Sequence, residues 1–366
     1  KGFLKMKVLK ESMIVAFAFV GVVVGAGFAT GQEIFQFFTS NGQFSVLGII
    51  ITGLIITLGG MFVLNTGYNI KSHNHSESIH YYLHPMIARL FDIVLTLFLF
   101  SLAIIMSAGG ASTIQESFHL PYWLSSLILV SLILVTLFLK FDRLIAVLGI
   151  VTPFLVIVVT IIAIYYLATG HLDFESANQY AQHKSSISLG WWFDGINYAS
   201  LQIAAAFSFL SVMGGRLHDQ RASIWGGLIG GVIITFLLLM INLGLITKFN
   251  DIKSVALPTL LLARHISPIL GTIMSIIMIL VIYNTIVGLM YAFASRFTTP
   301  FSKQYFVLII VMTIVTFICT FIGFISLIGK VFPIMGLFGF ILLIPILYKG
   351  VRHFKYSKKE GSKGEH

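Results

Sequence analysis

Charged residues are scarce in this sequence of 366 residues. Asp, Glu, Lys and Arg together make up 10% of the chain, against roughly 25% in an ordinary soluble domain. Hydrophobic residues account for 57%, and the mean hydropathy is +0.97. This composition excludes a soluble globular domain and indicates an integral membrane protein.

Cysteine is nearly absent, since Cys319 is the single one. One cysteine excludes an intramolecular disulfide, and its apolar surroundings indicate a buried thiol. Metal-binding patterns are missing too, because the histidines of SHNHSESIHYYLH (72–84) have no accompanying HExxH motif or cysteine cluster. We therefore expect neither an enzyme nor a resident cofactor.

Long apolar segments fill most of the chain. Each runs for about 20 residues or more, which suits a helix crossing ~30 Å of hydrocarbon rather than the ~10-residue alternating strands of a barrel. The expected spans are 12–39, 45–69, 85–113, 121–140, 144–169, 191–214, 223–248, 268–296, 304–326 and 331–349. The predicted fold class is an all-α polytopic membrane protein with ten transmembrane helices.

The basic residues predict how these spans are oriented. Of the 23 Lys and Arg residues, all fall on one side except Lys184, Lys248, Lys253, Arg264 and Lys330. Cytoplasmic ends carry the excess of positive charge, so both termini are expected in the cytoplasm and the chain in the bacterial cytoplasmic membrane. Because the net charge of +10 lies beside apolar segments, it indicates contact with the lipid bilayer and not with nucleic acid.

The polar loop 171–190 divides the chain, a single membrane domain over 1–366, into two halves. Residues 12–169 and 191–349 hold five spans each, followed by a basic cytoplasmic tail at 350–366. An odd number of spans per half predicts a 5+5 inverted repeat. Two other segments, SAGGAS (107–112) and GGLIGG (226–231), are small-residue faces that favour close helix packing.

The stretch GVVVGAGFATGQEIF (21–35) interrupts the first span with glycines and polar residues. Irregular backbone at membrane depth requires protein or a water-filled cavity to satisfy it, so the pattern predicts a broken helix beside a cavity. Thr30 and Glu33 fit a capping box, which would start a half-helix whose positive end suits an anionic group. Two interpretations of Glu33 stay open, a helix cap or a carrier of the coupling proton or cation. A glycine-rich helix interface is the competing interpretation of the whole stretch.

Span 6 carries a weaker counterpart of this pattern. Residues 204–215, AAAFSFLSVMGG, can be laid over 25–36, GAGFATGQEIFQ, with Phe207 matching Phe28. Interruptions at corresponding places in two halves indicate a transporter's binding site. We therefore predict a second break in span 6.

With these features the sequence resembles the amino acid/polyamine/organocation transporter superfamily, which has the LeuT-type fold. The start of the chain resembles the bacterial YkvI-type membrane proteins, a family whose members are expected to be amino-acid permeases. The resemblance implies that the two breaks bind the carboxylate and the amino group of a substrate, with Phe207 as a gate. The implied substrate-binding residues are Gly25, Ala26, Gly27, Phe28, Ala29, Thr30, Ala204, Ala205, Phe207 and Ser208.

The resemblance also implies a coupling-ion site, for Na⁺ or H⁺, between span 1 and span 8. Carbonyls from Val22 to Gly25 would face Val281, Asn284 and Thr285, although Asn284 departs from the usual hydroxyl residue. Oxygen ligands suit a hard cation, and sodium is the one metal expected. For proton coupling, the candidates are Glu33 and Asp194.

The function expected is a secondary active transporter that moves a small zwitterionic solute, an amino acid, by cation-coupled alternating access. Aromatic residues near span 6, namely Trp191, Trp192, Tyr198 and Phe207, would also suit a quaternary amine. A non-transporting membrane sensor of the same fold is the other alternative. Oligomeric state is not readable from the sequence.

Overall fold

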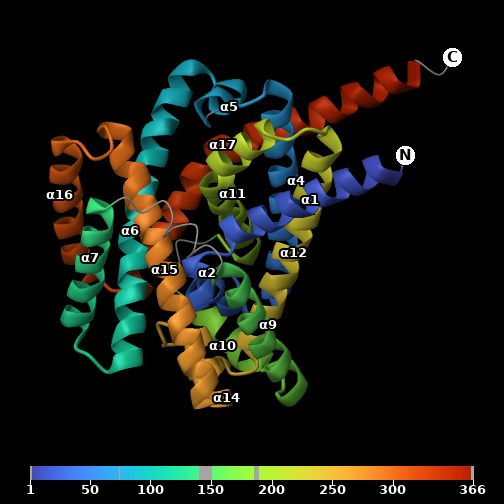
Figure 1. Ribbon diagram of the computed structural model, residues 1–366. Coiled ribbons are helices and arrows are strands. Elements are labelled where there is room, and N and C mark those ends of the chain that lie inside the picture. The colour runs from blue at the N-terminus through green and yellow to red at the C-terminus, as the bar shows by residue number, and fades with distance from the viewer. Residues whose placement is uncertain (1, 74, 140–150, 185–188, 364–366) are drawn as a thin grey trace.

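The computed structural model describes residues 2–73, 75–139, 151–184 and 189–363, and every regular element in these ranges is a helix. In chain order they are α1 Gly2–Val23, α2 Ala26–Thr30, α3 Gln32–Phe37, the 3₁₀ helix η1 Thr39–Phe44, α4 Ser45–Ile70, α5 His75–Tyr82, α6 Pro85–Phe118, α7 Tyr122–Phe138, α9 Val151–Thr169, α10 Phe174–His183, α11 Trp191–Gly215, α12 Gln220–Ile246, α13 Phe249–Ile252, α14 Pro258–Ile266, α15 Pro268–Phe297, α16 Lys303–Thr320 and α17 Phe324–Lys363. Long helices form a bundle, with both chain termini at one end and α10 and α14 at the other (Figure 1).

Seven of the described helices are long and apolar enough to cross a membrane, or eight if α9 and α10, which meet at a bend of 112°, count as one span. Each predicted span contains a helix, but α7 has only 17 residues and the start of span 5 lies outside the described residues. The protein is therefore a polytopic helical membrane protein, and the number ten stays a prediction.

The predicted interruption of span 1 is present in the structure. Helix α1 ends at Val23, α2 begins at Ala26, and α3 begins after Gly31. Gly31 has a φ of +77°, which disfavours a side chain, and a β-carbon there would lie 2.7 Å from Cγ2 of Thr259. Span 1 consequently consists of one long helix, α1, followed by two short ones, α2 and α3.

The predicted break in span 6 is wrong, because α11 is continuous from Trp191 to Gly215. Residues 204–206 are alanines, the best helix formers, and no glycine lies between Gly195 and Gly214. Both of these glycines instead allow close packing against α4, Gly195 against Gly48 and Gly214 against Leu64. The segment of span 6 that was matched to span 1 therefore lacks the glycines that interrupt the helix in span 1.

The glycines of GGLIGG give α12 two packing faces. Gly226 and Gly230 face α1, and a β-carbon on Gly226 would lie 2.5 Å from Cγ1 of Val15. Gly227 and Gly231 face α4, where a β-carbon on Gly227 would lie 2.5 Å from the α-carbon of Met61. The packing role predicted for this segment is confirmed, and α1, α4, α11 and α12 form one tightly packed group.

The glycines of SAGGAS also serve close packing, as predicted. A β-carbon on Gly109 would lie 2.8 Å from the ring of Phe324 in α17. One on Gly110 would lie 2.6 Å from Leu129 in α7 and 3.0 Å from Ile282 in α15. Helix α6 is thereby held against three neighbours.

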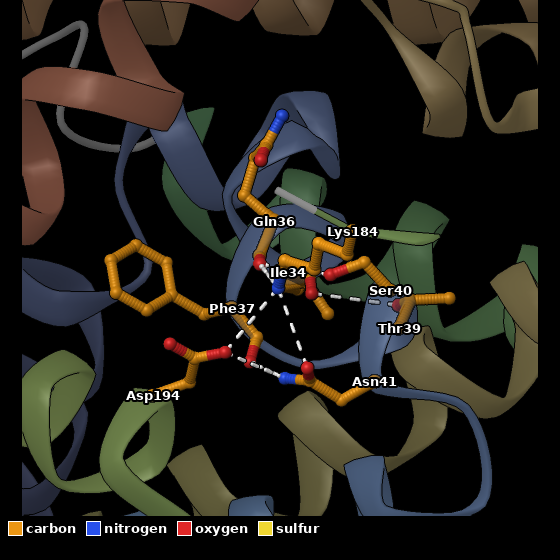
Figure 2. Close-up of polar contacts among 8 residues, drawn as sticks. All are labelled: Ile34, Gln36, Phe37, Thr39, Ser40, Asn41, Lys184 and Asp194. Carbon is orange, nitrogen blue, oxygen red and sulfur yellow. Dashed lines mark hydrogen bonds and ion pairs between the residues drawn. The ribbon is translucent and has the colours of Figure 1, made fainter. Parts of the chain in front are cut away.

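A half-buried lysine, Lys184, fixes the C-terminal end of span 1, which lies at the end of the bundle opposite the chain termini (Figure 2). The ammonium of Lys184, just after α10, donates to the carbonyl of Gln36 at 3.1 Å, to Oδ1 of Asn41 at 3.4 Å and to Oδ2 of Asp194 at 3.3 Å. Asn41 in turn donates to the same Asp194 oxygen at 2.9 Å. Three acceptors match the three N–H groups of lysine, so Lys184 ties α3 and η1 to the start of α11.

Candidate functional site

A cavity of about 260 Å³ lies at the break in span 1, and its lining comes from α1, α2, α3, α6, α11, α15 and α17. Most of the residues predicted for substrate or cation line it: Val22, Gly25, Ala26, Gly27, Phe28, Glu33, Ala204, Ala205, Ser208 and Thr285. Five do not belong to its lining: Ala29, Thr30, Phe207, Val281 and Asn284. The cavity thus brings together the break and the middle of α11.

The spacing along α11 follows from its being an unbroken helix. Leu201, Ala204, Ala205 and Ser208 all line the cavity, and they stand at i, i+3, i+4 and i+7, which is one face of a helix. Phe207 points elsewhere, since it is fully buried and its ring packs edge-on against Tyr82 at 6.1 Å between centroids. The structure does not place Phe207 as a gate of this cavity.

Glu33 is buried and carries a carboxylate into the cavity. Its Oε1 accepts a hydrogen bond from Nε2 of Gln202 in α11. Its Oε2 packs directly on Gly27, where a β-carbon would overlap it. The hydroxyl of Tyr198 lies against the same carboxyl and against Gln202, outside good hydrogen-bond geometry. Glu33 therefore joins α3 to α11 through neutral partners.

The capping-box interpretation of Glu33 is wrong. Gly31, in a left-handed conformation and without a side chain, is the N-cap of α3. The Thr30 hydroxyl donates to the carbonyl of Gly27 at 2.8 Å and accepts from the amide of Gln32 at 3.3 Å. The carboxyl of Glu33 turns to α11 instead of back to the amide of Thr30.

Ala29 lies against α14, and neither Ala29 nor Thr30 belongs to the cavity lining. The hydroxyl of Thr259, in the first turn of α14, donates to the carbonyl of Ala29. Because Gly31 also packs on Thr259, α14 covers the break from the end of the bundle opposite the chain termini. On that side the side chain of Thr259 therefore lies directly against the backbone of the break.

The proposed sodium ligands are only partly assembled. Thr285 lines the cavity together with Val22 and Gly25, but its hydroxyl donates to the carbonyl of Val281 at 2.8 Å. The side-chain oxygen of Asn284 is buried without a hydrogen-bond partner among the described residues. Sodium coordination by this set stays a prediction.

Several lining residues were missed by sequence reasoning. Gln202 was one, although an amide in the middle of an apolar span is itself a signal of interhelical hydrogen bonding. The apolar part of the lining comes from α6, α15 and α17: Leu95, Phe98, Leu99, Leu102, Met106, Leu289 and Phe332. Nothing in the local sequence marks these residues as a group.

Arg296 marks the end of the cavity that lies toward the predicted cytoplasmic side. It stands in the last turn of α15 and lines the cavity. Its Nη1 lies 3.1 Å from Oδ1 of Asp92 in α6 and also donates to the hydroxyl of Thr96. An ion pair therefore sits at this end of the cavity.

A second cavity, of about 580 Å³, lies toward the opposite side, between α3, α10, α11 and α17. Lys184 and Asp194 line it as an ion pair. Asp194, the other candidate for proton coupling, is buried and lines this second cavity, and it does not belong to the lining of the cavity at the break in span 1. Burial lowers the pKa of Lys184, and the nearby carboxylate of Asp194 acts in the opposite direction.

The aromatic residues of α11 do not form one box for a quaternary amine. Trp191 stacks on Phe44 at 5.4 Å between ring centroids, and Tyr198 packs against Phe37 at 5.2 Å. Trp192 is 44% exposed.

Among the described residues there is no group of three His, Cys, Asp or Glu side chains that could hold a metal ion.

The apolar helices define a class, the multi-span helical membrane proteins. A solved manganese transporter from Eremococcus coleocola has the same fold, with a TM-score of 0.57 over 94% of this chain and 79% of that chain, at 14% sequence identity. At that identity the likeness shows the LeuT-like fold alone.

Two Bacillus subtilis proteins are similar in sequence. The uncharacterized protein YyaD is 26% identical over 336 residues, which cover 90% of this chain and 94% of YyaD. The uncharacterized membrane protein YkvI is 27% identical over 223 residues, which cover 61% of this chain and 63% of YkvI. No protein-family model matches the chain. The resemblance to YkvI indicated by the first span is confirmed.

Proposed function

We propose that this protein is a secondary active transporter that moves a small zwitterionic solute, an amino acid, across the bacterial cytoplasmic membrane. The observation that carries the proposal is the cavity at the broken first span, where backbone of the break, Glu33 and the α11 face meet in the middle of a transporter fold. Its volume of about 260 Å³ is just below the range for pockets that hold drug-sized ligands, ~300–1,000 Å³. A cargo of amino-acid size suits such a cavity.

The proposed mechanism is alternating access, driven by Na⁺ or H⁺. Two features support it: α14 covers the break on one side, while the cavity extends to Arg296 on the other. With both termini in the cytoplasm, this arrangement corresponds to an inward-facing state. Spans 1, 2, 6 and 7 are the packed group α1, α4, α11 and α12, which would rock as a unit in a 5+5 inverted repeat of ten spans.

A manganese cargo has less support than an organic one. The name of the Eremococcus coleocola protein describes its own cargo, and hard divalent cations favour several oxygen ligands. In the cavity of the present chain, Glu33 supplies a single carboxylate among mainly apolar side chains. This lining favours a solute with an apolar body.

Uptake into liposomes tests the proposal. Purified protein is reconstituted, and accumulation of radiolabelled amino acids is followed under a sodium gradient and under a pH gradient. Ala205→Leu fills the cavity at an alanine exposed on its wall, so it should abolish uptake while the protein stays folded. Phe209→Leu is the control, because Phe209 lies on the same helix, is 43% exposed and does not belong to the cavity lining.

Gradient-driven uptake that Ala205→Leu removes and Phe209→Leu retains supports the proposal. Uptake unaffected by Ala205→Leu would move the pathway away from this cavity. If no amino acid accumulates in the liposomes although the protein still binds one, the result would favour the alternative function, a non-transporting membrane sensor.

A further inference from the structure

We infer that Glu33 is the counter-ion for an ammonium group of the cargo, so that this cavity recognises a small solute by its amine and its apolar body. The inference rests on the proposed function and names the group by which the cargo is selected. It assigns Glu33 to recognition of the cargo, in place of the helix cap or the coupling carrier.

The first argument is the charge around Glu33. Among the described residues, no Lys, Arg or His forms an ion pair with it, and its neighbours Gln202 and Tyr198 are neutral. Arg296 lines the same cavity, but its guanidinium faces Asp92. A buried carboxylate without a cation is expensive, and a ligand ammonium in the cavity would supply the missing charge.

The second argument is the accessibility of the carboxylate oxygens. A carboxylate offers about four acceptor positions, and Gln202 occupies one of them on Oε1. Oε2 rests on Gly27, whose lack of a side chain leaves the carboxyl at the cavity wall. Acceptor positions therefore remain for the N–H groups of an amine, while Gln202 acts as a positioning residue.

The third argument is the apolar character of the cavity into which Glu33 opens. Leu102 and Met106 from α6, Leu289 from α15 and Phe332 from α17 line it. These side chains offer aliphatic and aromatic contact and no charge. An amine with a hydrocarbon body fits this combination, whereas an acid without an amine would bring a second negative charge close to Glu33.

The test compares ligands that share a carbon skeleton. Alanine, leucine and phenylalanine are each measured beside the amine formed by removing the carboxyl group (ethylamine, isopentylamine, phenethylamine) and the acid lacking the amino group (propionate, 4-methylpentanoate, 3-phenylpropionate). Binding is read as the rise in melting temperature of the purified full-length protein, since a ligand that binds the native state stabilises it. The variant is Glu33→Gln, which keeps the shape and an oxygen that accepts from Gln202.

We expect at least one amino acid and its matching amine to stabilise the wild type, and the matching acid to have no effect. Glu33→Gln should weaken the apparent affinity for both by about tenfold or more, because hydrogen bonds to a charged group are the stronger ones. Glu11→Gln is the matched control, since Glu11 bonds to His218 at 3.1 Å and does not belong to the cavity lining. It should respond like the wild type.

Other outcomes overturn the inference. If the acid stabilises as well as the amino acid, or if Glu33→Gln responds like the wild type, Glu33 does not recognise the amine, although the proposed transport function can stand. If none of the nine compounds raises the melting temperature, the inference falls together with the proposed cargo class. Amine binding that depends on Glu33, without any uptake into liposomes, would contradict only the transport function.

Discussion

Replacement of Gly27 by alanine should destabilise the protein through Glu33 and through little else. An added β-carbon would lie closer than 3.0 Å to Oε2 of Glu33 and 3.3 Å from its Cδ, whereas ordinary contacts begin at 3.4 Å. The carboxyl must therefore move, which disrupts its hydrogen bond with Gln202. A hydrogen bond to a charged group contributes about 1.5–3 kcal/mol to stability, partly offset by up to ~1 kcal/mol from the better helix propensity of alanine.

A double-mutant cycle isolates this contact. In a Glu33→Ala background the obstructing carboxyl is gone, so Gly27→Ala should be neutral or stabilising by up to ~1 kcal/mol. The expected coupling between the two positions is thus about 1.5–3 kcal/mol. Gly21→Ala in α1 is the control, because a β-carbon there would meet no atom within 4 Å.

The single cysteine supplies the assay. Cys319 is half-buried, so a dye that fluoresces on reaction with thiols reports the exposure of this residue as the protein is heated. All variants are heated at the same rate, because irreversible unfolding makes the apparent melting temperature depend on that rate. A net loss of ~1–2 kcal/mol should lower the apparent melting temperature of Gly27→Ala by a few degrees. An equal loss in the wild-type and the Glu33→Ala backgrounds would refute the contact between Gly27 and Glu33.

Two further predictions concern helix packing and the half-buried lysine. Gly227→Ala places a β-carbon 2.5 Å from the α-carbon of Met61. Because the backbone cannot rotate away, the substitution should cost about 1–3 kcal/mol. In the same dye assay the control Gly288→Ala, whose β-carbon would meet no atom within 4 Å, should be neutral or stabilising by up to ~1 kcal/mol, and equal melting temperatures of the two variants would contradict this packing. Burial lowers the pKa of Lys184 in the folded protein below its ordinary 10.5. At a pH between the pKa of the folded state and that of the unfolded state, the unfolded chain binds more protons than the folded one, so the stability contributed by Lys184 rises with pH. The melting temperature of the wild type minus that of Lys184→Met should therefore grow as the pH is raised from 7 toward 10, and a shrinking difference would show that this sign is wrong.

The break in span 1 was predictable because its cause is local. Gly25 and Gly31 weaken the helix at the positions where the structure interrupts it, and glycine does so in any surroundings. A break in span 6 was wrongly predicted, because the comparison with residues 204–215 matched the positions of residues and did not ask whether glycines were present to interrupt the helix. Had span 6 been read as continuous, its helical period would have put Ala205 on one face and Phe207 on nearly the opposite one.

The environment of Glu33 depends on tertiary structure. The S/T-x-x-E spacing of Thr30 and Glu33 is a genuine cap signal, but the left-handed turn at Gly31 starts α3 one residue later. Gln202, the partner that replaces the cap, lies 169 residues away in the chain. Such a pairing requires the packing of α3 against α11, which no local pattern encodes.

The two glycine faces of α12 also restrict how this helix can change in length. Gly226 and Gly230 serve α1, while Gly227 and Gly231 serve α4. One residue inserted between Gly227 and Gly230 would turn everything that follows by about 100° around the helix axis. Gly230 and Gly231 would then leave their partners together. Relatives that keep this packing should accordingly differ in length at the loops that flank α12, and keep the distance between its glycines fixed.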